Sequence, residues 1–458
     1  MRYDTDTIFA QATPPGRAAI AIIRISGDRA FQVPTAFGCD VPEPGQFRVA
    51  RLVDNEGDQL DEVLILAMKG PRSSTGEDVV EIHAHGSLAV TAAIMRQLGR
   101  MDGFRAAGPG EFTHRMFANG KIDLLGAEAL ADLIDAETDR QRLQAWRQHD
   151  GVLHRPVDSW RDALVGLAAQ LEAVIDFADE DLPATIETRI HTDTRALANA
   201  IEHVLDDDRE GERVRAGVTV SLVGPVNAGK STLLNRLAGR DVAIVSSQAG
   251  TTRDIVSVRI DLDGVPVTLL DTAGLRDTDD VIEAEGVRRA RHAARETDAA
   301  LLVVDSSSAD WRADLATLRD LAGSNQAILL TKRDQLDPAT ISSTAEEIAA
   351  YGVVARLVSL ADDEGGNQVE QLLELLRGLV VPANRPETQS IITRERHRHA
   401  LQRALSALRA VDDLDLGTAP ELAAEEYRRA ADSLGRLTGQ VDVEELLDSI
   451  FSSFCIGK

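Results

Sequence analysis

The sequence predicts a multidomain α/β protein in which a doubly wound, mostly parallel sheet is inserted into a helical domain. Between residues 215 and 380, short apolar runs alternate with amphipathic stretches, which is typical of strands and helices that alternate along a chain. On both sides, at residues 119–214 and 381–458, apolar residues recur at helical spacing. The first 118 residues carry short β-type runs, and 458 residues exceed what one hydrophobic core supports.

The composition limits the classes of function. The 75 acidic and 49 basic residues give a formal net charge of −26, which excludes indiscriminate nucleic-acid binding by the overall field, so any RNA contact must be local. The two cysteines, Cys39 and Cys455, are too few for a disulfide framework and fit a reducing compartment. No apolar run approaches the roughly 18 residues of a membrane span and no signal-peptide core is present, so we expect a cytoplasmic protein.

Strands are expected in the N-terminal segment at residues 18–25, 63–68 and 79–86. Arg24 interrupts the first of these runs, and a charged residue in a buried strand is costly unless it is paired. Arg24 is therefore expected either at a sheet edge with a carboxylate partner or facing a ligand. The sequence alone leaves both interpretations open.

Strict alternation in the third run places Glu81, His83 and His85 on one face of the strand. These ionisable groups suggest two interpretations. A metal site would need a further ligand at a telling spacing, and the sequence offers none. An ordinary half-solvated strand is therefore the favoured interpretation.

The segment 119–214 is predicted to be mostly helical, and after a linker at residues 382–386 helical spacing resumes toward the C-terminus. The simplest packing joins these two blocks into one discontinuous domain. An Asp263-Gly264 pair between alternating apolar residues predicts a hairpin that adds an antiparallel edge strand to the inserted sheet. The other strands of that sheet are expected at residues 218–223, 265–270, 299–304, 327–330 and 353–358.

Residues 224–231 form a GxxxxGKS motif between an expected strand and an amphipathic helix. Such a loop directs backbone N–H groups and a helix N-terminus at one point, so it binds phosphate. We expect Lys230 to reach the outer phosphates and the Ser231 hydroxyl to bind Mg²⁺.

Polar segments follow the phosphate loop in the order typical of a nucleotide switch. Residues 250–254 offer a threonine hydroxyl to Mg²⁺ and the γ-phosphate, and residues 271–274 offer a carboxylate and a flexible glycine. At residues 331–334, Asp334 can accept hydrogen bonds from the N1–H and 2-amino groups of guanine, a donor pair that adenine lacks. Ser359-Leu360 ends the last expected strand, where a backbone N–H would meet the guanine carbonyl.

The hydrolytic position of the switch departs from the simplest pattern. Leu275 stands where Ras-like proteins have a water-orienting glutamine, and leucine cannot orient water. Asn227 offers an amide oxygen that could hold a monovalent cation beside the phosphates. The water-activating group is left open among the acidic residues Asp277, Asp279, Asp280, Glu283 and Glu285.

These features together resemble the MnmE/TrmE family of tRNA-modification GTPases along essentially the whole chain. Its signatures are matched at residues 12–17, 23–27, 75–78, 108–112 and 454–458. The resemblance implies a tetrahydrofolate-binding and dimerisation domain at 1–118, a helical domain at 119–214 and 381–458 that ends in Cys-Ile-Gly-Lys, and an inserted Ras-like P-loop GTPase domain at 215–380.

The resemblance also implies individual roles. Glu283 matches the catalytic, water-activating glutamate of the family. Mg²⁺ would be bound by Ser231 and Thr252, and K⁺ by Asn227, Ser246, Gln248 (backbone) and Thr251. The folate contacts would be Arg24, Glu81, Lys121 and Lys458, which favours a ligand opposite Arg24. The motifs and the resemblance together give these GTP contacts: Asn227, Ala228, Gly229, Lys230, Ser231, Thr232, Ser246, Ser247, Gln248, Ala249, Gly250, Thr251, Thr252, Asp271, Thr272, Ala273, Gly274, Thr331, Lys332, Arg333, Asp334, Ser359 and Leu360.

Two residues depart from the guanine-binding pattern of the family. Thr331 replaces the usual asparagine and Leu360 the usual alanine. Threonine is shorter, so we expect the amide contact to the base to be lost while Asp334 preserves the preference for guanine. Cys455 is expected either as a small buried residue or as a thiol close to the folate and the modified base.

The resemblance implies a K⁺-activated GTPase that uses GTP, Mg²⁺ and formyl- or methylene-tetrahydrofolate. The protein would act as a homodimer with a flavin-dependent GidA/MnmG-type partner to install an aminomethyl or carboxymethylaminomethyl group on the wobble uridine of certain tRNAs. A pure conformational switch, for example in ribosome assembly, would leave tRNA unchanged. A folate-dependent transferase with a vestigial GTPase would transfer carbon without GTP.

Overall fold

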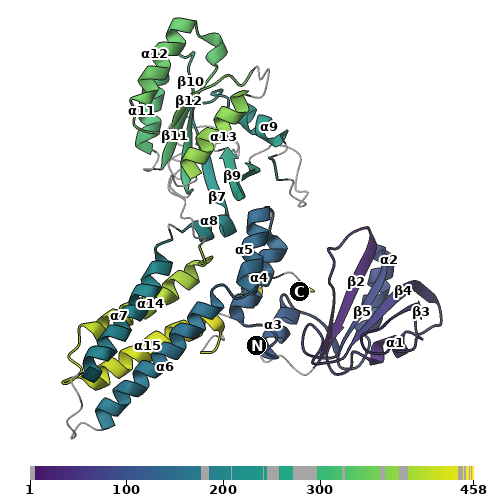
Figure 1. Ribbon diagram of the computed structural model, residues 1–458. Helices are drawn as coiled ribbons and strands as arrows, with labels where there is room; N and C mark the ends of the chain where they lie inside the picture. The colour runs from purple at the N-terminus through teal and green to yellow at the C-terminus, as the bar shows by residue number, and fades with distance from the viewer. Residues whose placement is uncertain are drawn as a thin grey trace, which may run out of the picture. The chain divides into compact units, whose positions relative to one another are not determined.

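The computed structural model describes residues 6–176, 185–207, 209–240, 242–244, 257–271, 297–321, 325–361, 367–380, 390–441, 447, 450–452, 454 and 456–457. The chain divides into two compact units (Figure 1). One comprises Met1–Ile134, Trp146–Glu202 and His399–Lys458, and the other comprises Asp135–Ala145 and His203–Arg398. Among the described helices, none is both long enough and apolar enough to cross a membrane.

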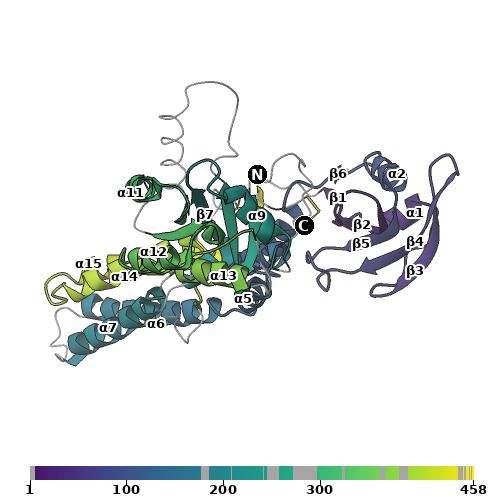
Figure 2. The same cartoon turned by 90° about the horizontal axis from the view of Figure 1, so that it is seen from above.

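The first unit begins with a six-stranded sheet of order β3-β4-β5-β2-β1-β6, antiparallel except where β1 pairs with β6. Its strands are β1 (Thr7–Gln11), β2 (Ala18–Ser26), β3 (Phe47–Val53), β4 (Gln59–Met68), β5 (Val79–Gly86) and β6 (Phe104–Ala106). The helices α1 (Gln32–Ala36) and α2 (Leu88–Leu98) lie on one face and close a core with Ile23, Ile65 and Ile82 (Figures 1 and 2).

The expected strands at residues 18–25, 63–68 and 79–86 are present. Strict alternation on β5 is also observed, since Val80 and Ile82 are buried in the core while Glu81 and His83 are only partly buried. The expectation of a sheet edge for Arg24 is wrong, because β2 lies between β5 and β1. Arg24 is tolerated there because it faces away from the core and pairs with a carboxylate on β5.

Helices from both sides of the insertion pack together in the first unit (Figure 1). The Thr194 hydroxyl lies 2.6 Å from the Tyr427 hydroxyl in a buried contact, and Arg195 pairs with Asp412 at 2.7 Å. The helical domain is therefore discontinuous, as predicted. Its helices are α4 (Leu124–Asp135), α5 (Asp139–His149), α6 (His154–Asp176), α7 (Thr185–Leu205), α14 (Glu395–Asp412) and α15 (Pro420–Thr438), of which α4, α5, α7 and α14 extend across the division between the units. The helix α3 (Glu111–Ala118) precedes them, within the first 118 residues.

The second unit contains a six-stranded sheet of order β12-β11-β10-β7-β9-β8. All neighbours are parallel except β8, which forms the expected antiparallel hairpin with β9; positive φ angles at Asp263 (53°) and Gly264 (85°) fit a type I′ turn. The strands are β7 (Val218–Val223), β8 (Ser257–Leu262), β9 (Val265–Asp271), β10 (Ala299–Asp305), β11 (Gln326–Thr331) and β12 (Ala355–Leu357), so the last strand is shorter than predicted.

Helices cover both faces of this sheet, which makes it doubly wound. Side chains of α9 (Lys230–Ala238) and α13 (Asn367–Val380) share one core with the sheet. Side chains of α11 (Trp311–Leu321) and α12 (Pro338–Ala349) share another (Figure 1). The short helix α8 (Glu210–Ala216) precedes β7, and a 3-10 turn at Arg333–Gln335 follows β11. The carboxyl ends of the parallel strands meet at one edge, where such folds bind ligands.

Candidate nucleotide site

The phosphate loop connects β7 to α9, with Gly229 at the helix N-cap. Gly229 and Asn227 have φ angles of 99° and 67°, a left-handed conformation that turns successive N–H groups toward one point. Gly224 is required sterically, because a Cβ there would lie 1.9 Å from the Val303 carbonyl oxygen. Lys230 is buried, and its ammonium group donates to the carbonyls of Gly224 and Pro225 at 2.7 Å each. The loop thus gathers its N–H groups and one ammonium group at the start of a helix.

Two of the residues expected near Mg²⁺, Ser231 and Asp271, are brought together at the end of β9. The Ser231 hydroxyl donates to a carboxylate oxygen of Asp271 at 3.3 Å, although the two residues are far apart in the sequence. They meet because β7 and β9 are parallel neighbours that end at the same edge of the sheet. Hydroxyl and carboxylate oxygens suit the hard Mg²⁺ ion, so this pair fits the predicted metal position.

The guanine loop follows β11. The Ser359 hydroxyl donates to Asp334 Oδ1 at 2.6 Å, and Lys332 pairs with Asp305 at 2.5 Å. Although burial opposes ionisation of Asp305, hydrogen bonds from Lys332 and Ser307 hold the pKa of its carboxyl below the ordinary value. The loop is therefore fixed by side chains from the ends of β10 and β12.

Thr331 connects the guanine loop to the phosphate loop. Its side chain is 1% exposed, and its hydroxyl donates to the Ala228 carbonyl at 2.7 Å and lies 3.2 Å from that of Val304. A Cβ placed on Gly229 would lie 3.4 Å from Leu360 Cδ1 and 3.5 Å from Thr331 Cγ2. The two departures from the family pattern therefore pack against the same glycine, and the shorter threonine still makes a polar contact with the phosphate loop.

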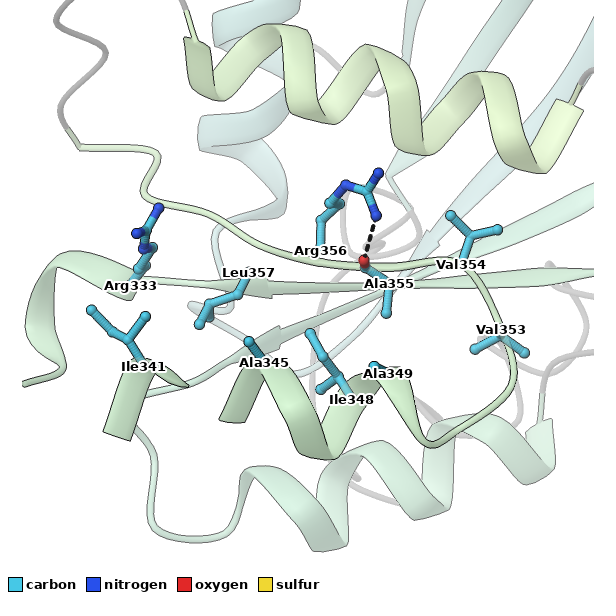
Figure 3. Close-up of a pocket in the computed structure, with 10 residues that line it drawn as sticks. All are labelled: Arg333, Ile341, Ala345, Ile348, Ala349, Val353, Val354, Ala355, Arg356 and Leu357. Carbon is cyan, nitrogen blue, oxygen red and sulfur yellow. Dashed lines mark hydrogen bonds between the residues drawn. The ribbon is translucent and has the colours of Figure 1, made fainter. Parts of the chain in front are cut away.

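Arg333, predicted as a GTP contact, lines a separate pocket of about 530 Å³ between α12 and β12 (Figure 3). Apart from Arg333 and Arg356 the lining is aliphatic, and the Arg356 guanidinium donates to the Ala355 carbonyl at 3.0 Å. This lining offers neither a carboxylate for a base nor a cluster of N–H groups for phosphates.

Two of the expected folate residues are in contact on the first sheet. Arg24 Nε donates to Glu81 Oε1 at 2.8 Å, and the other oxygen of Glu81 lies 3.2 Å from His83 Nε2. The Arg24 guanidinium also lies 5.9 Å from the centre of the Phe112 ring. The alternation of the strand placed His83 on the face of Glu81, and Phe112 ends the signature at residues 108–112, but neither residue was predicted as a folate contact. Lys121 is instead held at the loop before β5, where its ammonium group donates to the Pro71 carbonyl at 2.9 Å.

The end of the chain lies against the N-terminal sheet, which no local sequence pattern indicates but which agrees with the grouping of Lys458 with Arg24 that the resemblance implies. Ile456 forms an isolated β-bridge with Pro109, and a Cβ on Gly457 would lie 2.3 Å from the Gln11 carbonyl oxygen. Gln11 is paired with Ile23, beside Arg24. Gly457, the residue before Lys458, therefore lies against β1, and β1 pairs with β2, the strand that carries Arg24.

Thr232, another predicted GTP contact, is exposed in the first turn of α9. The other predicted site residues lie outside the described part of the chain. They are Ser246, Ser247, Gln248, Ala249, Gly250, Thr251, Thr252, Thr272, Ala273, Gly274, Glu283, Cys455 and Lys458, and the alternatives Asp277, Asp279, Asp280 and Glu285 lie there too. Within the described residues, no group of three or more His, Cys, Asp or Glu is arranged to hold a metal ion. On β5, His85 pairs with Asp61, at 2.8 Å.

Similarity to known proteins covers the whole chain. A family model for the MnmE helical domain matches residues 124–455, and one for the GTP-binding protein TrmE N-terminus matches residues 7–121. Among solved structures, Aquifex aeolicus Era bound to GDP and AlF4⁻ is 24% identical, with 42% of this chain and 66% of that chain covered and a TM-score of 0.27.

Curated relatives match over nearly their full length. The tRNA modification GTPase MnmE of Paramagnetospirillum magneticum is 47% identical over 455 residues, which cover 99% of this chain and all of the relative. That of Rhodospirillum rubrum is 46% identical over 471 residues, with 99% of each chain covered. The chain therefore belongs to the MnmE family of tRNA modification GTPases.

Proposed function

We propose that this family member is a cytoplasmic, K⁺-activated GTPase that acts as a homodimer with a GidA/MnmG-type flavoprotein. Together they install an aminomethyl or carboxymethylaminomethyl group on the wobble uridine of certain tRNAs, with a one-carbon unit from formyl- or methylene-tetrahydrofolate. GTP hydrolysis with Mg²⁺ follows from membership of the family. The domain limits at residues 118, 214 and 380 are part of the proposal.

The observation that carries the proposal is the joining of phosphate loop and guanine loop by the Thr331–Ala228 hydrogen bond. It supports one continuous site in which Lys230 and the loop N–H groups bind the phosphates and Asp334 reads the base. Ser231 and Thr252 would hold Mg²⁺, which would supply positive charge to the outer phosphates. Asp271 lies within hydrogen-bond distance of the Ser231 hydroxyl and orients it.

Besides the binding of phosphates, base and Mg²⁺, hydrolysis needs further positive charge beside the phosphates and an oriented water molecule. Asn227, Ser246, Gln248 and Thr251 would bind K⁺ beside the phosphates, and Glu283 would activate the water that Leu275 cannot orient. Asn227 stands at the left-handed turn of the loop, next to the helix N-terminus that receives the phosphates.

The exposed face of the N-terminal sheet supports the folate site and the dimer. One row across the strands reads Phe47, Leu66, Glu81 and Arg24, so an apolar edge adjoins a charge pair. Phe47 and Val49 are 69% and 63% exposed, which is unusual for large apolar side chains gathered on one sheet face. We propose that a second copy covers this face and that Arg24 and Glu81, with Lys121 and Lys458, bind the polar groups of the folate.

Turnover in K⁺ and Na⁺ tests the hydrolytic assignment. Replacing KCl by NaCl should lower the turnover of GTP by about 10²-fold or more while GTP affinity stays within about twofold, because K⁺ stabilises charge that develops in the transition state. Glu283→Ala should lower turnover similarly in saturating KCl, and Glu285→Ala serves as the matched control. Equal turnover in the two salts contradicts K⁺ activation, and a fully active Glu283→Ala enzyme would transfer the role to another acidic residue.

A further inference from the structure

Ser359 and Leu360, which are predicted to meet the guanine carbonyl, are held by a side chain from α13. The backbone N–H of Ser359 donates to the side-chain oxygen of Gln368 at 3.1 Å. Gln368 lies in the first turn of α13, beyond the loop that follows Ser359, and no motif in the sequence singles it out. Ser359 is 7% exposed, so its N–H needs a partner within the protein.

Two of the three backbone N–H groups at residues 359–361 already have acceptors. The N–H of Ser359 is occupied by Gln368, and that of Ala361 donates to the Ser359 hydroxyl oxygen at 3.3 Å. Between them, the N–H of Leu360 has no acceptor among the described residues. It is the donor left for the carbonyl oxygen of guanine.

Ser359 also orients the carboxylate that distinguishes guanine from other bases. Its hydroxyl donates to Asp334 Oδ1 at 2.6 Å, while Asp334 itself is exposed and has no buried packing to fix its rotamer. A change in the position of Ser359 therefore changes both the direction of the Asp334 carboxylate and the position of the Leu360 N–H.

We propose that Gln368 is a positioning residue for guanine recognition. Its amide oxygen holds Ser359 so that the Asp334 carboxylate faces the N1–H and 2-amino edge of guanine and the Leu360 N–H faces the carbonyl. The inference rests on the proposed function of this site in binding GTP. In this role Gln368 would act through Ser359 and not on the nucleotide itself, so its removal should affect selectivity and affinity more than the chemical step.

The discriminating ligand is inosine diphosphate, which keeps the carbonyl and N1–H of guanosine diphosphate but lacks the 2-amino group. With full-length protein and Mg²⁺, calorimetry should give Gln368→Met about tenfold weaker binding of guanosine diphosphate, the loss expected when one buried hydrogen bond is left unmade. Its preference for guanosine over inosine diphosphate should fall by a similar factor, because Asp334 is no longer directed at the 2-amino group. The kcat at saturating GTP should stay within about twofold of the parent, with the loss in KM.

Two further variants separate this role from general damage. Gln368→Glu keeps an acceptor oxygen and should restore the ratio of the two affinities. Gln371→Ala, a glutamine on the same helix, should leave the ratio unchanged. A merely structural role for Gln368 would weaken both nucleotides equally and leave their ratio as in the parent.

The parent protein separates failure of the inference from failure of the proposed function. If the parent does not prefer guanosine diphosphate over inosine and adenosine diphosphates, the site itself is wrongly assigned. If the parent shows that preference and Gln368→Met retains it in full, the site stands and the role of Gln368 is overturned.

Discussion

At the scale of single residues, the hydroxyl of Thr331 is the polar link between the two loops that grip a nucleotide. From the sequence we expected threonine to lose the contact of the family's asparagine to the base. The side chain is instead directed at the carbonyl of Ala228, a contact that sequence reasoning could not foresee because it depends on how closely β11 approaches the phosphate loop. Leu360 fills space beside the Thr331 methyl, against Gly229.

Thr331→Val tests this link because valine keeps the shape and removes the hydroxyl. The carbonyls of Ala228 and Val304 lose a donor, so the affinity for GDP should fall about tenfold, equivalent to roughly 1–2 kcal/mol. Thr331→Ser keeps the hydroxyl and is the matched control, expected near the parent value in calorimetry. Parent-like binding by Thr331→Val would mean that the hydrogen bond does not support nucleotide binding.

In the N-terminal domain, the buried carboxylate of Glu111 links Arg105, Arg115 and the backbone of Gly108. This carboxylate is 1% exposed and pairs with Arg105 at 2.6 Å and Arg115 at 3.3 Å. Burial raises its pKa, but hydrogen bonds from Arg105 and the Gly108 N–H outweigh burial and hold the pKa below the ordinary value of a glutamate. A lowered folded-state pKa contributes stability above about pH 4.5, and that contribution is lost as the pH falls through the folded-state value.

Glu111→Gln should therefore destabilise the protein near pH 7 by about 3 kcal/mol, because the buried carboxylate that pairs with Arg105 and Arg115 loses its charge. The difference from the parent should shrink as the pH is lowered toward 3, where the parent carboxyl also becomes neutral. Urea unfolding followed across this pH range measures the difference. A constant difference at all pH values would show that packing, and not charge, is the contribution of Glu111.

At the scale of elements, strands with strong periodicity and the Asp263-Gly264 hairpin were predictable, whereas β1, β3 and β6 of the N-terminal sheet were not. The parallel strands β7, β9, β10 and β11 appear as near-continuous apolar runs because both faces are buried. The strands β1 and β6 are short, and β3 is an edge strand whose exposed residues include Phe47 and Val49, so its pattern does not match a buried strand. Contacts between distant segments, such as Gln368 with Ser359 and Ile456 with Pro109, leave no local pattern.

The exposed face of the N-terminal sheet gives the prediction at this scale. Val49→Glu places a charge in the middle of the apolar edge, and burying that charge against a second copy would be costly, so sedimentation should show a shift from dimer to monomer. Val165→Glu is the control, because Val165 is equally exposed, at 67%, on the helical α6. A Val49→Glu protein that remains dimeric would place the dimer interface elsewhere.

At the scale of the whole molecule, the chain combines a nucleotide site in one unit with a charged, partly apolar sheet face in the other. The net charge of −26 opposes attraction of tRNA by the overall field, so recognition of tRNA must rely on local contacts or on a partner. This combination is what the proposal explains: hydrolysis of GTP in one unit serves chemistry on RNA that the other unit supports.

The most direct test of this central claim is mass analysis of wobble nucleosides in tRNA from cells that lack the protein. The account predicts that the aminomethyl-type uridine is absent, that the parent restores it, and that Asp271→Asn, which removes a charge beside the Mg²⁺ position, does not. Restoration by Asp271→Asn variants without GTPase activity would favour a transferase with a vestigial GTPase. Unchanged wobble uridine in cells without the protein would contradict the account and favour a conformational switch.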